Sequence, residues 1–163
     1  MTPGLRKFLL TLHVVASVGW MGAVAVFLAL AVAGLLSSDS QIIRASYIAM
    51  DLTYRTVVVS LGLASLATGL VSSLATDWGL FRYYWIIVKL LVTVPTIVLM
   101  LVHMRPVNRL ASLVSIILLP NADLAQPGLQ LLVYACLALL VLLVATALST
   151  YKPRGRTRYA ARA

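Results

Sequence analysis

Residues 8–36 read FLLTLHVVASVGWMGAVAVFLALAVAGLL, and this stretch contains no Asp, Glu, Lys or Arg. A helix needs about 20 predominantly apolar residues to cross the hydrocarbon core of a bilayer. The stretch is therefore long enough to form a transmembrane helix. A cleavable signal peptide has an apolar core of only about 7–15 residues, so we expect this segment to remain in the mature protein.

Three further apolar segments are long enough to cross a bilayer, at residues 56–76, 84–104 and 128–151. Their apolar residues are continuous rather than alternating, which favours helices over the strands of a membrane barrel. The sequence thus predicts an all-α protein, a polytopic membrane four-helix bundle. We expect residues 1–163 to form a single integral membrane domain.

The composition supports the same class of protein. Hydrophobic residues make up 62% of the 163 residues and charged residues 10%, against about 45–50% and 25% in soluble domains. A soluble chain of this length could not bury so much apolar surface, and disorder requires the opposite composition. The single cysteine, Cys136, excludes an intrachain disulfide.

Basic residues are distributed unequally between the two ends of the predicted bundle. One end carries Arg6, Lys7, Arg82, Lys152, Arg154, Arg156, Arg158 and Arg162; the other carries Arg44, Arg55, Arg105 and Arg109. The positive-inside rule then places both termini in the cytoplasm. We expect the basic tail, residues 152–163, to contact anionic lipid headgroups rather than nucleic acid.

Polar residues outside the four spans also show helical spacing. In residues 105–119 the apolar and polar side chains fall on opposite faces, which predicts an amphipathic helix on the outer membrane surface between spans three and four. Residues 41–55 are less regular. They contain Asp51 and Arg55, an i,i+4 pair in the favourable order.

Small residues predict where the spans contact one another. The second span has two small-residue stripes with i,i+4 spacing, and the first span has a shorter set. Such residues allow close approach of helices in lipid. The stripes are Ser60, Ala64, Thr68 and Ser72; Ser65, Gly69 and Ser73; and Ala16, Gly19 and Ala23. The fourth span has few polar residues, and we expect it to contribute least to any chemistry.

Ionisable residues at bilayer depth are costly, which makes them candidates for function. His13 and Lys89 each lie five residues into a span that runs outward, about 7.5 Å from its inner end at 1.5 Å per residue. Ser17 and Trp20 follow His13 at i+4 and i+7 and share its face. His13 and Lys89, with Ser17 and Trp20 beside His13, are therefore our candidates for a binding site near the cytoplasmic face.

Two simpler interpretations of these residues stay open. The Lys89 side chain could extend its ammonium to the headgroups, and His13 could serve only as a hydrogen-bonding residue between helices. His103 lies about 28 Å along the third span from Tyr84, at the outer interface. It is therefore too far from His13 to share a metal ion with it.

The motifs around the two inner residues resemble a known superfamily of small bacterial four-helix membrane proteins. The matching segments are LHVVASVGWMG at residues 12–22 and WIIVKL at residues 85–90. The superfamily includes HemJ-type protoporphyrinogen oxidases, CopD-type copper-resistance proteins and a family of predicted integral membrane proteins without known activity, to which this chain is most similar. The resemblance implies haem b or another porphyrin bound through His13, with Lys89 near a propionate, in the inner membrane of a bacterium.

Three functions follow as alternatives. The first is a haem- or porphyrin-binding membrane protein. The second is a CopD-like protein that handles copper or another small ion, with Met21, Met100, Met104 and His103 as candidate ligands. The third is a non-catalytic scaffold that joins a homo-oligomer or a partner subunit through its small-residue stripes. The sequence leaves open whether the protein catalyses a reaction.

Overall fold

The computed structural model describes residues 2–74, 83–116 and 121–151, with side chains except at 103–106, 108–110, 113–116 and 121–125. The elements are α1 (Pro3–Leu36), α2 (Ser40–Thr53), the π-helix η1 (Tyr54–Val58), α3 (Val59–Leu74), α4 (Tyr84–Ile116) and α5 (Asn121–Tyr151). Thr2 caps α1, where its side chain accepts a hydrogen bond from the backbone N–H of Leu5. The basic tail, residues 152–163, lies outside the described residues.

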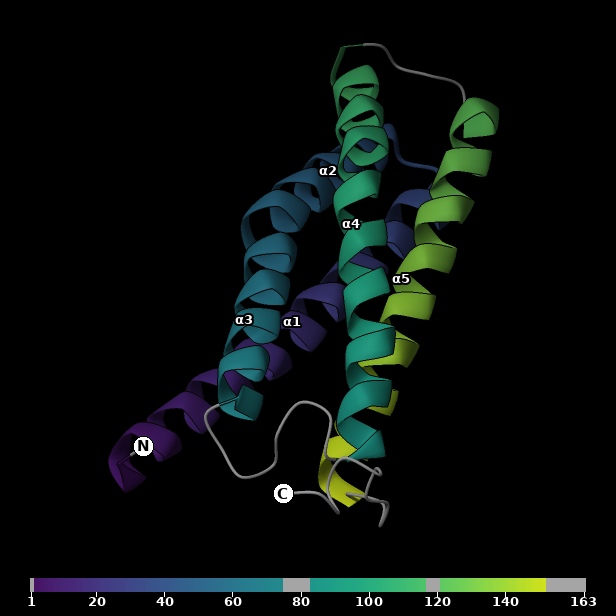
Figure 1. Ribbon diagram of the computed structural model, residues 1–163. Helices are drawn as coiled ribbons and strands as arrows, with labels where there is room; N and C mark the ends of the chain where they lie inside the picture. Colours follow the sequence, from purple (N-terminus) through teal and green to yellow (C-terminus); the bar gives the residue numbers. More distant parts are fainter. Residues whose placement is uncertain (1, 75–82, 117–120, 152–163) are drawn as a thin grey trace.

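Four helical stretches in the described part of the chain are long and apolar enough to cross a membrane: Pro3–Leu36, Ser40–Leu74, Tyr84–Val102 and Gln126–Tyr151. The predicted all-α four-helix membrane bundle is therefore confirmed. Figure 1 shows α1 running obliquely across the bundle, with the start of α1, the end of α3, the start of α4 and the end of α5 at the same end.

The second span begins earlier than its predicted start at residue 56. Residues 40–74 form one helical stretch, in which η1 joins α2 to α3. The polar side chains of Asp51 and Arg55 interrupt the apolar run, so hydropathy alone does not detect the first half of this helix. Asp39 caps it, because its carboxylate accepts a hydrogen bond of 2.8 Å from the backbone N–H of Gln41.

The amphipathic segment at residues 105–119 is helical to residue 116, and residues 117–119 lie outside the described part. It does not form a separate helix lying on the membrane surface, because α4 continues through it without a break (Figure 1). Val107 and Ala111 on its apolar face are buried. The prediction assigned this face to the lipid surface, whereas helix α2 packs against α4.

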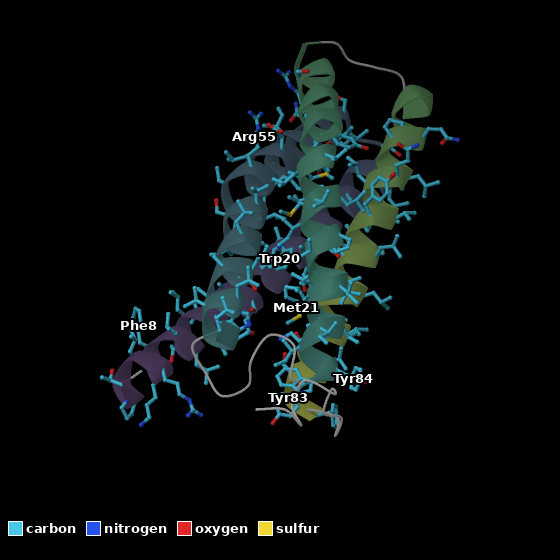
Figure 2. The ribbon with its side chains drawn as sticks, in the orientation of Figure 1. Phe8, Trp20, Met21, Arg55, Tyr83 and Tyr84 are labelled. Atoms are coloured by element: carbon cyan, nitrogen blue, oxygen red, sulfur yellow. The ribbon has the colours of Figure 1, made fainter. Side chains whose placement is uncertain are left out.

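The buried core lies where α1 meets α2, α3 and α5. Its largest members come from α1 and from the α2–η1 segment: Trp20, Phe27, Tyr47, Met50 and Tyr54. Figure 2 shows Trp20 and Met21 at mid-height of the bundle, with Arg55 toward one end and Phe8, Tyr83 and Tyr84 toward the other. The large core side chains of α1 thus lie between the end of the bundle that holds Arg55 and the end that holds Tyr83 and Tyr84.

Candidate functional site

The contact between α1 and α3 is organised by large side chains on α1 that lie over glycines on α3. A Cβ atom added to Gly62 would lie 3.0 Å from Cε2 of Trp20, and one added to Gly69 would lie 3.0 Å from Cε1 of His13. Both pairs are seven residues apart on their helices, in antiparallel order. The absence of a side chain at these two positions lets each ring lie directly against the backbone of α3.

His13 is held in this contact by two hydrogen-bonding groups of α3. Its Nδ1 atom lies 3.0 Å from the backbone carbonyl oxygen of Ser65 and 3.1 Å from Oγ1 of Thr68. The Thr68 hydroxyl donates to the carbonyl oxygen of Ala64 at 2.6 Å. A carbonyl oxygen can only accept, so Nδ1 carries the proton and donates it to this pair of oxygens.

The other ring nitrogen of His13 is the one left for a ligand. With Nδ1 protonated, Nε2 carries the lone pair of the neutral imidazole. Among the described residues, Nε2 has no hydrogen-bond partner. The ring is only partly buried, so the lone pair lies at the edge of the helix contact. A histidine fixed by a Nδ1–H to carbonyl hydrogen bond is the usual arrangement of a metal-ligating histidine.

Ser17 and Trp20 extend the same face of α1 away from His13. The Ser17 hydroxyl lies 2.8 Å from the Ser65 hydroxyl, so Ser65 contacts α1 through both its backbone and its side chain. Trp20 is 2% exposed and packs against Gly62. The prediction that His13, Ser17 and Trp20 share a face is confirmed, and that face is directed at α3.

Lys89 is directed mainly at α5. Its ammonium donates a hydrogen bond of 2.6 Å to the hydroxyl of Ser149, which in turn donates to the carbonyl oxygen of Ala145 at 2.9 Å. The Lys89 Nζ atom lies 6.0 Å from the centre of the Trp85 ring, within reach of a cation–π contact. His13 is thus held against α3 and Lys89 against α5, and no hydrogen bond joins the two side chains in the described part of the chain.

The fourth span therefore contributes more than the sequence predicted. We expected the fourth span to contribute least to any chemistry, yet Ser149 of α5 accepts the hydrogen bond of the Lys89 ammonium. Three further residues of the site were not predicted as site residues. Ser65 accepts a hydrogen bond from His13 through its carbonyl oxygen, Thr68 is a second hydrogen-bonding partner of His13, and Gly62 packs beneath Trp20. Ser65 and Thr68 lay in the small-residue stripes, but only as packing residues, and Gly62 lay in neither stripe.

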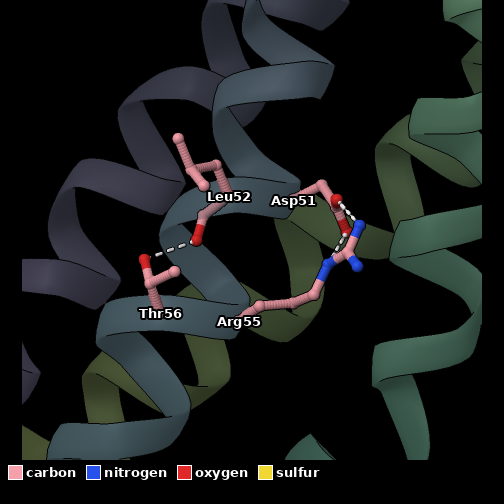
Figure 3. Close-up of polar contacts among 4 residues, drawn as sticks. All are labelled: Asp51, Leu52, Arg55 and Thr56. Atoms are coloured by element: carbon pink, nitrogen blue, oxygen red, sulfur yellow. Dashed lines mark hydrogen bonds and ion pairs between the residues drawn. The ribbon is translucent and has the colours of Figure 1, made fainter.

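The opposite end of the bundle carries the predicted pair of Asp51 and Arg55. Arg55 Nε donates to Asp51 at 3.0 Å, and a second guanidinium nitrogen donates to the other carboxylate oxygen, as Figure 3 shows. In the same view the Thr56 hydroxyl donates to the carbonyl oxygen of Leu52 at 2.7 Å. Both carboxylate oxygens are engaged with the guanidinium, so this pair stabilises the α2–η1 junction.

Metal ligands other than His13 are not gathered into a cluster. In the described part of the chain, no group of three or more His, Cys, Asp or Glu side chains could hold a metal ion. The side chains of His103 and Met104, two candidate copper ligands, lie outside the described residues. Met100 is buried against Gly62, and Met21 is half-buried against the core.

Comparison with known proteins gives no assignment. No known protein family, curated protein or solved structure matches the chain. The class of protein defined by the fold is a multi-pass integral membrane protein, with four helical stretches of membrane-spanning length and composition in the described part of the chain.

Proposed function

We propose that this protein binds haem b or a related metalloporphyrin through Nε2 of His13. The single observation that carries the proposal is the orientation of the imidazole, with Nδ1 anchored on the Ser65 carbonyl at 3.0 Å and Nε2 without a hydrogen-bond partner in the described residues. A purely structural histidine at a helix contact would more often use both nitrogens, since polar groups in lipid are costly to leave unpaired.

The glycine beneath the imidazole fixes the ring against α3. A Cβ atom on Gly69 would lie 3.8 Å from Nε2 and 3.0 Å from Cε1, so only glycine lets the ring pack this closely on the backbone of α3. The donor is a neutral imidazole nitrogen, which suits iron. Bound haem would supply a redox-active iron; the residues of this chain would hold and orient it.

Lys89 has the charge required to hold a porphyrin carboxylate. Its ammonium has three N–H donors, and the hydrogen bond to Ser149 uses one of them. The remaining donors can meet a propionate in the neighbourhood of His13. The hydroxyl of Ser149 then acts as the residue that positions Lys89, and Ser17 and Trp20 hold α1 against α3 beside the ligand.

We further propose that the protein lies in a bacterial inner membrane with both termini in the cytoplasm. The excess of Lys and Arg at one end of the bundle supports this orientation. In it, His13 and Lys89 lie toward the cytoplasmic face, and the basic tail lies beside anionic headgroups.

The test is the absorption spectrum of the purified protein. We expect the wild-type protein, expressed with an adequate haem supply and purified in mild detergent, to show a Soret band. His13→Gly should lose the band, and free imidazole added to that variant should restore it, because the small ligand can occupy the space of the missing ring. Stoichiometric copper without pigment, or co-purified subunits with neither, would contradict the proposal and favour one of the other two functions.

A further inference from the structure

A cavity of about 170 Å³ lies among α1, η1, α4 and α5. Four aromatic side chains contribute to its wall: Trp20, Phe27, Tyr54 and Tyr134. Its inner residues are buried, whereas Leu99 and Leu137 at its rim are 48% and 54% exposed. Both lie within membrane-spanning stretches of α4 and α5, so the cavity opens between these helices toward lipid.

The cavity is distinct from the neighbourhood of His13. None of His13, Ser17, Ser65 and Lys89 lines it, and of the four predicted site residues only Trp20 does. Its volume is well below the ~300–1,000 Å³ of pockets that hold drug-sized ligands, so a porphyrin cannot enter. Cavities of about 150 Å³ with apolar walls are known to hold one benzene ring, and the size therefore fits a single ring with short substituents.

One residue that lines the cavity has a buried polar atom without a partner. Trp20 is 2% exposed, and its indole Nε1 is buried without a hydrogen-bond partner in the described residues. Two other donors of the wall are in use: the Tyr54 hydroxyl donates to the carbonyl oxygen of Met100 at 2.6 Å, and the Thr96 hydroxyl to that of Val92 at 2.7 Å. Because buried polar groups are nearly always paired, the free indole N–H indicates an acceptor that comes from outside the chain.

The backbone that forms one wall of the cavity is unusual. In η1 the N–H of Val59 bonds to the carbonyl oxygen of Tyr54, five residues back. Tyr54 and Val58 both line the cavity, and the ring of Tyr54 packs on Phe27 with 5.4 Å between centroids. Single π-helical turns occur frequently at functional sites, and this one places two side chains on the cavity wall.

We propose that this cavity binds a lipid-soluble six-membered ring compound carrying one carbonyl oxygen, which enters from the bilayer between α4 and α5 and accepts a hydrogen bond from Trp20 Nε1. The aromatic walls and the volume favour a ring. The unpaired indole N–H favours an acceptor on that ring. A lipid acyl chain would fill the apolar space but would leave Nε1 unpaired, so we favour the ring ketone over an acyl chain as the occupant of the cavity.

Two fluorinated probes of the same shape test the proposal: 4′-fluoroacetophenone, which has a carbonyl oxygen, and 1-ethyl-4-fluorobenzene, which has none. Binding to the detergent-solubilised protein is followed by ¹⁹F NMR relaxation, with empty micelles as the reference. We expect the ketone to bind about three- to tenfold more tightly, the value of one neutral hydrogen bond. Trp20→Phe keeps an aromatic ring but removes the donor, so the two affinities should become equal.

Two leucine substitutions on α5 form a matched pair for the location. Ala138 is half-buried and lines the cavity, so Ala138→Leu should abolish binding of both probes; Ala147 is exposed and does not line it, so Ala147→Leu should leave both affinities unchanged. His13→Ala should also leave them unchanged, which separates this site from the proposed haem site.

Several results would overturn the proposal: no binding of either probe to the wild-type protein, equal affinity of the two probes, or binding that survives Ala138→Leu. Equal affinity would identify an acyl-chain site, and a ketone preference that persists in Trp20→Phe would exclude the indole as donor. If Trp20→Phe fails to fold, the comparison of the two probes on the wild-type protein still decides whether the cavity prefers a carbonyl.

Discussion

The Nδ1 atom of His13 lies 3.0 Å from the backbone carbonyl oxygen of Ser65, across the contact between α1 and α3. This hydrogen bond sets the tautomer of the imidazole and fixes the orientation of the ring. Its acceptor is a main-chain carbonyl, which cannot rotate away as a side chain can. The same residue, Ser65, meets Ser17 through its hydroxyl at 2.8 Å. One residue of α3 therefore fixes both the position of α1 and the direction of its histidine.

The first prediction concerns the iron ligand. His13→Ala should abolish the pigment of the purified protein, whereas His103→Ala should leave its spectrum unchanged, because the two residues lie about 21 Å apart along the bundle at 1.5 Å per residue. Absorption spectra of matched preparations provide the measurement. Loss of pigment in His103→Ala together with its survival in His13→Ala would contradict both the depth estimate and the resemblance.

The second prediction concerns the glycines beneath the two rings. A Cβ atom at Gly62 or Gly69 would lie 3.0 Å from the ring of Trp20 or His13, so Gly62→Ala and Gly69→Ala should each be less stable than Gly22→Ala by about 1–3 kcal/mol, as overpacking predicts, because all three substitutions gain the same helix propensity. Unfolding in mixed micelles of a mild detergent and sodium dodecyl sulfate provides the measurement.

Gly22 is the control for these substitutions, since a Cβ atom there would meet nothing within 4 Å. Gly22→Ala should have no destabilising effect, and its better helix propensity should raise stability by up to about 1 kcal/mol. Equal effects of the three substitutions would show that the helix contact does not depend on close approach at Gly62 and Gly69.

The third prediction concerns the hydrogen bond that joins η1 to α4. The buried hydroxyl of Tyr54 donates to the carbonyl oxygen of Met100 at 2.6 Å, and Tyr54→Phe should reduce the free energy of unfolding by about 0.5–1.5 kcal/mol. Tyr151, whose side chain is 84% exposed, is the matched control: Tyr151→Phe should change nothing. A Tyr54→Phe variant as stable as the wild type would mean that this hydrogen bond contributes no net free energy.

The fourth prediction concerns the orientation in the membrane. In a Cys136→Ala background, a cysteine introduced at residue 163 should resist a membrane-impermeant maleimide in intact cells, and a cysteine in place of Ser38 should react. Ser38 is exposed between α1 and α2, at the end of the bundle opposite the start of α1. Reaction of residue 163 from outside the cells would reverse the proposed topology.

The number of spans and the class of protein could be predicted from the sequence alone. Residues 8–36 illustrate why: an uncharged apolar run longer than the bilayer is thick has few alternatives to a transmembrane helix. The shared face of His13, Ser17 and Trp20 was equally predictable, because helical periodicity sets the direction of each side chain relative to its neighbours on the same helix. The pair of Asp51 and Arg55 followed from local spacing in the same way.

Only the tertiary structure decided which groups these faces meet. Periodicity does not determine the rotation or the register of one helix against another, so nothing in the sequence paired His13 with the carbonyl oxygen of Ser65, a group that every residue possesses. The same limit applies to Lys89 and Ser149, which are far apart in sequence and meet because α4 packs against α5. The π-helical turn at Tyr54 was not predicted either, because local propensity carries no clear signal for an extra residue in a helical turn; in the structure this turn packs against α1.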